Sequence, residues 1–91
     1  MKRRINWRAI VDRHKRKTEE TWQDPEALNA FKKIEVVDKL VDLFMETRRK
    51  LDKNSGDIAA GKACLGILKT VREMYIAWYR DQYPAIKLLD V

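Results

Sequence analysis

The sequence predicts an all-α fold, a three-helix arrangement built on a long antiparallel αα-hairpin. Residues 25–53 and 58–82 both carry apolar side chains at alternating steps of four and three, which is typical of a coiled-coil seam. A short polar stretch, residues 54–57, separates the two segments and suits a tight connection. Three glycines and two prolines in 91 residues leave few places for turns. The chain is therefore expected to be one small domain of long helices.

The first helix is predicted at about residues 6–22, within a basic N-terminal segment that spans residues 1–23. Asn6 can serve as its N-cap, because its short side chain can accept a backbone N–H bond. One face of this helix gathers residues at spacings of three and four, which indicates the buried side. These residues are Trp7, Ile10, Val11, His14, Thr18 and Trp22.

The second helix is predicted to begin after Asp24 and to run without interruption to residue 53, about 43 Å at the usual helical rise. Asp24 is a good N-cap, Pro25 suits the first helical position, and Glu26 favours the positive end of the helix. Arg48 occupies the one polar position of the predicted seam. The apolar positions of that seam are Ala30, Ile34, Val37, Val41, Phe44 and Leu51.

The third helix is predicted at residues 58–82, which completes a hairpin over residues 24–83. The connection offers a residue able to adopt a left-handed cap and a polar N-cap for the next helix. Gly61 and Gly66 stand among small residues, which predicts a close helix crossing. Tyr83-Pro84 ends the helix, and the apolar tail 84–91 is expected to dock. The predicted seam is Ala60, Cys64, Ile67, Val71, Met74 and Trp78.

Further apolar residues lie away from these seams, and they are the candidate interface. Apolar bands of this extent usually indicate a partner, and for a small hairpin the commonest partner is a second copy. The alternative is a compact three-helix bundle in which the first helix and the tail cover everything. The candidate interface residues are Val36, Leu40, Leu43, Ile58, Leu65, Ile76, Tyr79 and Tyr83.

The positive charge is concentrated at the N-terminus. Residues 1–17 hold eight basic residues against Asp12 alone, a formal charge of +7, so the other residues sum to −1 against a total of +6. Such asymmetry is typical of a segment that faces a polyanion, although a solvated basic helix that aids solubility is an equal alternative. The candidate nucleic-acid-binding residues are Lys2, Arg3, Arg4, Arg8, Arg13, Lys15, Arg16 and Lys17.

Residues for catalysis are scarce, so we expect no enzyme, no metal and no cofactor. His14 is the single histidine, and its place on an apolar face favours a core or interface role. Cys64 is the single cysteine and lies on a seam, where a buried thiol behaves as a small hydrophobe. A reducing compartment is the simpler expectation. No apolar run reaches the roughly 18 residues of a membrane span, so we expect a cytoplasmic protein, in the host cytoplasm if the chain is viral.

The hairpin resembles that of the small terminase subunits that package phage DNA. The resemblance covers residues 36–68 and depends on the turn Asn54-Ser55-Gly56-Asp57 followed by the alanine-rich Ile58-Ala59-Ala60-Gly61-Lys62-Ala63. It implies a ring-forming, DNA-binding recognition protein without enzymatic activity. The chain departs from that family before the hairpin, where it has a basic helix and no helix-turn-helix reader. No functional residue can therefore be carried over.

Two hypotheses for function follow. The first is a self-associating helical assembly module whose basic N-terminal helix contacts DNA or RNA. The second is a small adaptor or inhibitor that docks its hairpin on a host protein, as a phage-encoded chain would. The two differ in what the basic helix meets, a nucleic acid or an acidic protein surface.

Overall fold

The computed structural model describes residues 5–22 and 24–82. Four helices make up most of this part, which contains no strand, so the predicted all-α class is confirmed. They are α1 (Trp7–Glu20), α2 (Pro25–Lys32), α3 (Glu35–Lys53) and α4 (Ile58–Gln82). The predicted tail, residues 84–91, and Tyr83 lie outside the described residues, as do Lys2, Arg3 and Arg4.

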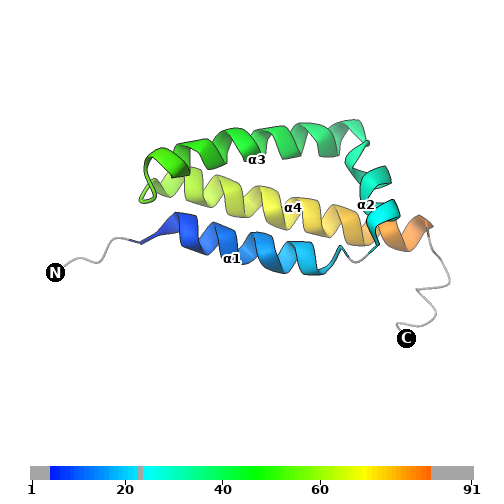
Figure 1. Ribbon diagram of the computed structural model, residues 1–91. Coiled ribbons are helices and arrows are strands. Elements are labelled where there is room, and N and C mark those ends of the chain that lie inside the picture. Colours follow the sequence, from blue (N-terminus) through cyan, green and yellow to red (C-terminus); the bar gives the residue numbers. More distant parts are fainter. Residues whose placement is uncertain (1–4, 23, 83–91) are drawn as a thin grey trace.

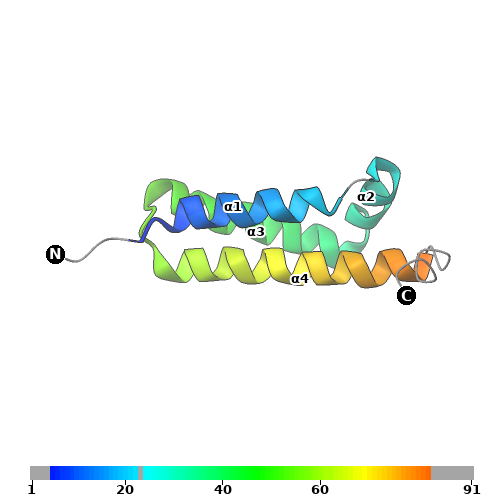
Figure 2. The same cartoon turned by 90° about the horizontal axis from the view of Figure 1, so that it is seen from below.

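Three long helices lie lengthwise beside one another, and α2 is a short connector at one end (Figure 1). α3 and α4 follow one another through the turn at residues 54–57. In the view from below, α1 and α3 both lie on the same side of α4 (Figure 2). α4 is therefore the helix on which both of the others rest.

The prediction of one helix over residues 25–53 is wrong, because the chain breaks between α2 and α3. Lys33 is still helical, but Ile34 is extended, with φ −64° and ψ 129°, and α3 begins after it. Ile34 acts as an N-cap without any side-chain hydrogen bond. The sequence has no glycine, proline or capping side chain at this break, so nothing in it predicts the break.

Packing explains the break. Phe31 and Val37 are both 1% exposed and belong to the same core cluster. Six residues at 100° each would place them about 120° apart around one continuous helix, so a straight helix could not bury both against α4. The break re-aims α2, and Phe31 then meets the Tyr75 ring edge-on, with ring centroids 5.1 Å apart. Ala30, which the predicted seam included, is exposed instead.

The core consists of two clusters arranged along α4. The first joins α1, α3 and α4 and is built from Val11, Leu51, Ala60, Cys64 and Leu68. The second joins α2, α3 and α4 and is built from Phe31, Val37, Ile67, Val71 and Tyr75. Phe44 packs against both clusters and makes them continuous. Most of the buried residues of α3 and α4 are those of the predicted seams.

The helix starts follow the predicted capping. Asn6 Oδ1 accepts from the Ala9 N–H at 3.1 Å, and Asp24 Oδ1 accepts from the Ala27 N–H at 3.2 Å. Asp57 Oδ1 likewise accepts from the Ala60 N–H at 3.1 Å. The predicted left-handed cap before α4 is wrong, because Asn54 is extended with φ −148° and no residue of the described ranges has a positive φ.

A close contact between α1 and α4 occurs at Gly61. A Cβ added at Gly61 would lie 2.5 Å from the Trp7 indole and 2.7 Å from the Trp7 Cβ. The backbone N–H of Trp7 also donates to the Ser55 carbonyl at 2.9 Å, which ties the start of α1 to the turn before α4. The predicted close crossing is thus found at Gly61. It is not found at Gly66, where an added Cβ would meet nothing within 4 Å.

Cys64 lies at the centre of the first core cluster, and none of its surface is exposed. Burial raises the pKa of the Cys64 thiol, while the nearby positive charge of Arg48 lowers it to a smaller extent. The net direction is upward, so the thiol stays protonated in the folded chain. Its expected role in core packing is thereby supported.

The two helical glycines give a matched pair of substitutions. Gly61→Ala is expected to destabilise the fold by about 1–3 kcal/mol, because the whole Trp7 side chain must move away. Gly66→Ala is expected to stabilise it by about 0.5–1 kcal/mol, since alanine favours a helix and the site is open. Urea unfolding followed by circular dichroism measures both. Equal effects of the two substitutions would contradict the contact between Trp7 and α4.

The reactivity of Cys64 tests its burial. At pH 8 the native chain is expected to react with a thiol-specific disulfide reagent at least about a hundredfold more slowly than the urea-unfolded chain, because core opening costs several kcal/mol. The raised pKa of the Cys64 thiol also makes the stability of the fold depend on pH. The folded thiol keeps its proton at a pH where the unfolded thiol loses it, so stability should fall as pH rises above the unfolded pKa. Rapid labelling of the native chain would contradict a buried thiol.

Candidate functional site

The structure divides the basic residues of α1 into two groups. On the side toward α3, Arg8 Nε lies 3.3 Å from Asp52 Oδ1. About two turns further along α1, Lys15 Nζ lies 3.7 Å from Glu19 Oε1. Arg13, Arg16 and Lys17 make no ion pair within residues 5–22 and 24–82. The predicted nucleic-acid-binding set therefore contains residues that already have acidic partners and residues that have none.

Arg8 belongs to a network that ties α1 to α3, whereas the Lys15–Glu19 pair lies within α1. Arg48 donates to Asp12 Oδ1 across the two helices at 2.8 Å, and to Asp52 within α3. The Arg48 side chain is only 20% exposed, so this is the best shielded of the ion pairs. The polar residue of the predicted α3 seam thus serves to hold α1 in place. Arg8 shares the Asp52 carboxylate, and its charge is used inside the molecule.

On its other side, α1 meets α4 along a shallow groove of about 160 Å³, called here the α1–α4 groove. Two of its residues are cationic, Lys69 and Arg72 of α4, and His14 of α1 adds an imidazole. None of the lining residues is acidic. The full lining is His14, Thr18, Leu65, Leu68, Lys69 and Arg72.

Helix geometry explains why these side chains meet. Leu65, Lys69 and Arg72 stand at steps of four and three, so they share one face of α4. On α1, Arg13 and Lys17 lie on the same flank as His14, at about 100° and 60° from it around the helix. Both are exposed. Two cations of α4, Lys69 and Arg72, therefore line the α1–α4 groove, and Arg13 and Lys17 are exposed on the neighbouring flank of α1.

His14 was expected in the core or at an interface. It is exposed, so it does not lie in the core, and the interface role stays a prediction. The helix face is right, because the preceding and following turns of that face bury Val11 and Thr18. His14 lies at the edge of this face, where the groove to α4 opens. A spacing of three from a core residue is compatible with either position, and only the neighbouring helix decides between them.

Sequence reasoning missed Lys69 and Arg72 as partners of the α1 cations. The signal was present in the spacing of Leu65, Lys69 and Arg72, which places two cations and an apolar residue on one helix face. The sequence does not show, however, that this face lies against α1. Residues 18–91 have a net charge close to zero, so a charge count along the sequence does not single out Lys69 and Arg72.

Half of the predicted interface residues are exposed. Val36 is 49%, Leu43 48%, Ile58 56% and Ile76 38% exposed. Leu40 and Leu65 are half-buried against the core clusters. Tyr79 is half-buried as well, and its hydroxyl donates to Asp24 Oδ2 at 3.3 Å. Tyr83 lies outside the described residues. The four described helices therefore leave part of the predicted interface open.

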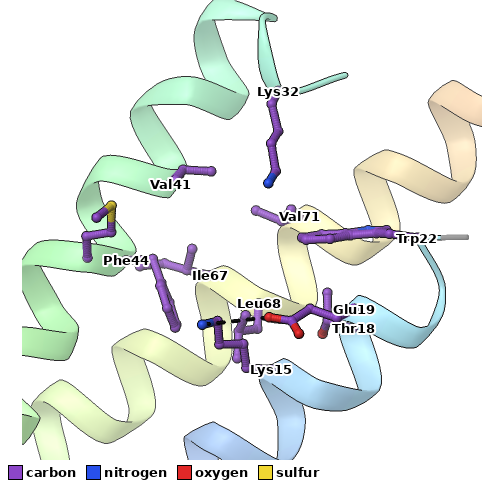
Figure 3. Close-up of a pocket in the computed structure, with 11 residues that line it drawn as sticks. Lys15, Thr18, Glu19, Trp22, Lys32, Val41, Phe44, Ile67, Leu68 and Val71 are labelled. Carbon is purple, nitrogen blue, oxygen red and sulfur yellow. Dashed lines mark ion pairs between the residues drawn. The ribbon is translucent and has the colours of Figure 1, made fainter. Parts of the chain in front are cut away.

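A second hollow, of about 310 Å³, lies between α1 and α3 with α4 as its floor and is called here the α1–α3 pocket (Figure 3). Its inner surface is apolar and includes Val41, Phe44, Ile67, Leu68 and Val71. Trp22 and three charged residues, Lys15, Glu19 and Lys32, border it. Sequence reasoning missed this pocket, because it exists only through the separation of α1 from α3.

Groups for catalysis or metal binding do not gather in the described chain. No set of three or more His, Cys, Asp or Glu side chains among residues 5–22 and 24–82 is placed to hold a metal ion. Cys64 and His14, the single residues of their kinds, lie apart, the first in the core and the second at the surface. Within the same ranges no helix is both long and apolar enough to cross a bilayer.

Comparison with known proteins gives no relative. No family model matches the chain, and no match is found among curated proteins or among solved structures.

Proposed function

We propose that the chain is a non-enzymatic helical assembly module that self-associates and contacts nucleic acid through the α1–α4 groove. One observation carries the proposal. The cations on the α3 side of α1 are neutralised by acidic partners, whereas Arg13 and Lys17, with Lys69 and Arg72 of α4, have no such partner among the described residues. Cations left unpaired beside one another at a surface are available to phosphates.

The geometry of this surface suits a phosphate backbone better than a single anion. α1 is 14 residues long, which gives about 21 Å at the usual helical rise, long enough to lie beside several successive phosphates of one strand. Lys69 and Arg72 line the groove on α4, and Arg13 and Lys17 are exposed on the neighbouring flank of α1, so the four charges are spread over a surface and not gathered at one point.

A second candidate function has its own observation in the exposed apolar residues of α3. Val36 and Leu43 are seven residues apart on one helix face and about half exposed. The same surface suits either a second copy or a host protein. In the adaptor hypothesis the basic groove meets an acidic protein surface, so nucleic-acid binding is the property that separates the two candidates.

Four substitutions test the α1–α4 groove: Arg13→Gln, Lys17→Gln, Lys69→Gln and Arg72→Gln together. The wild-type chain is expected to bind duplex or single-stranded DNA with an affinity that falls steeply between about 50 and 200 mM salt, because binding releases counterions. The variant is expected to bind at least about tenfold more weakly and with a smaller salt slope, since each lost phosphate contact removes up to about 0.9 from the slope. Fluorescence anisotropy with a labelled oligonucleotide measures both quantities.

The matched control removes the same charge elsewhere. Lys33, Arg49, Lys50 and Lys53 are exposed and lie outside both hollows. Changing these four to glutamine should leave most of the affinity in place. An equal loss in the control would mean that net charge alone is responsible. A wild-type chain that fails to bind at about 50 mM salt would favour the adaptor.

Self-association is tested on α3. Val36→Glu with Leu43→Glu is expected to reduce the mass in solution to that of one chain, 10.8 kDa, because two charges cannot be buried in an apolar interface. Stability should change little, since both positions are about half exposed. Light scattering gives the mass, and Ala63→Glu with Thr70→Glu, two exposed positions seven residues apart on α4, is the control. A wild-type chain that is a single copy at all concentrations would remove the assembly hypothesis.

A further inference from the structure

Described residues form the walls, the floor and both ends of the α1–α3 pocket, which opens to solvent at its mouth. α1 and α3 form its walls and α4 its floor (Figure 3). At one end, the pair between Asp12 and Arg48 ties the two walls together, one helical turn before Lys15 and one turn after Met45. At the other end stand Trp22 and, from α2, Lys32. The bounded length along α1, from Lys15 to Trp22, is about 10 Å.

This size selects the kind of occupant. A docked helix is itself about 10 Å wide and needs a groove that is open at both ends to continue. The pocket is closed at one end by an ion pair, and its volume of about 310 Å³ is that of a small-molecule site. Pockets for small ligands begin at roughly 300 Å³. The pocket is therefore suited to a small apolar molecule and not to a helix.

The charges at the mouth add a preference for an anion. Lys15 is already paired with Glu19, as Figure 3 shows. Lys32 has no acidic partner in the described part of the chain. Its ammonium lies over the Trp22 ring, 5.7 Å from the ring centroid, at the edge of the apolar surface. An ammonium held there keeps its three N–H donors available to an incoming carboxylate.

We propose that the α1–α3 pocket binds a small amphiphilic anion, an apolar chain that carries one carboxylate. The apolar chain lies on Phe44, Ile67 and Val71, and the carboxylate is held at the mouth by Lys32. Apolar burial supplies most of the affinity, and the ion pair sets the orientation and the preference for an acid. This site adjoins the α1–α4 groove, since Thr18 and Leu68 line both, but Lys32, Phe44, Ile67 and Val71 line the pocket alone.

Calorimetry with sodium decanoate, below its micelle-forming concentration, tests the proposal on the full chain. Saturable binding of one decanoate per chain is expected. Lys32→Gln should weaken it roughly two- to fivefold, as expected for an exposed ion pair, and should leave binding of 1-decanol unchanged. Lys33→Gln is the matched control, because Lys33 is adjacent and exposed but does not line the pocket.

A second variant tests the apolar part. Val41→Phe fills the pocket and should weaken both decanoate and decanol by more than about tenfold, whereas Ala63→Phe, at an exposed position of α4 outside the pocket, should not. Lys32→Gln is a surface change and stays informative even if Val41→Phe does not fold. Absence of saturable binding, or equal affinities for Lys32→Gln and Lys33→Gln, would overturn the proposal. So would a Val41→Phe variant that changes the mass in solution and not the decanoate affinity, which would identify a second copy as the occupant.

Discussion

The fold depends on the contact between Trp7 and the start of α4. Gly61 leaves open the space that the Trp7 indole fills, and the backbone N–H of Trp7 donates to the Ser55 carbonyl. This contact sets where α1 lies along α4. Four residues later, Val11 enters the core beside Leu51 and Leu68 with none of its surface exposed. The position of α1 on the other helices is thus determined by contacts in its first turns.

The two hollows follow from that position. α1 rests on α4 and is drawn to α3 at one end, where Arg48 reaches Asp12. Toward its other end, Trp22 and Lys32 border the pocket between α1 and α3. The side of α1 toward α3 consequently borders an apolar pocket, while the side away from α3 borders a groove with cations. One helix therefore has two chemically different flanks, although its sequence shows only a basic helix with one apolar face.

The sequence was sufficient for what depends on local periodicity and capping. The seams of α3 and α4, the caps at Asn6, Asp24 and Asp57 and the span of α4 are all visible as spacings or as single residue types. What depends on a distant neighbour was not predictable. The break at Ile34 has no breaker residue and exists because Phe31 packs on Tyr75, 44 positions further along the chain. The exposure of His14 and the pairing of Arg8 depend in the same way on helices far away in the sequence.

The same reasoning shows why net charge is a poor guide to the proposed nucleic-acid surface. Residues 1–17 carry a formal charge of +7, yet Arg8 and Lys15 are neutralised within the molecule. The cations that replace them at the groove, Lys69 and Arg72, come from a region with almost no net charge. A phosphate responds to the field where it lies, within about a Debye length of roughly 8–10 Å, and not to a total over the chain. The relevant quantity is the number of unpaired cations on one surface, and the packing of α1 on α4 brings them together there.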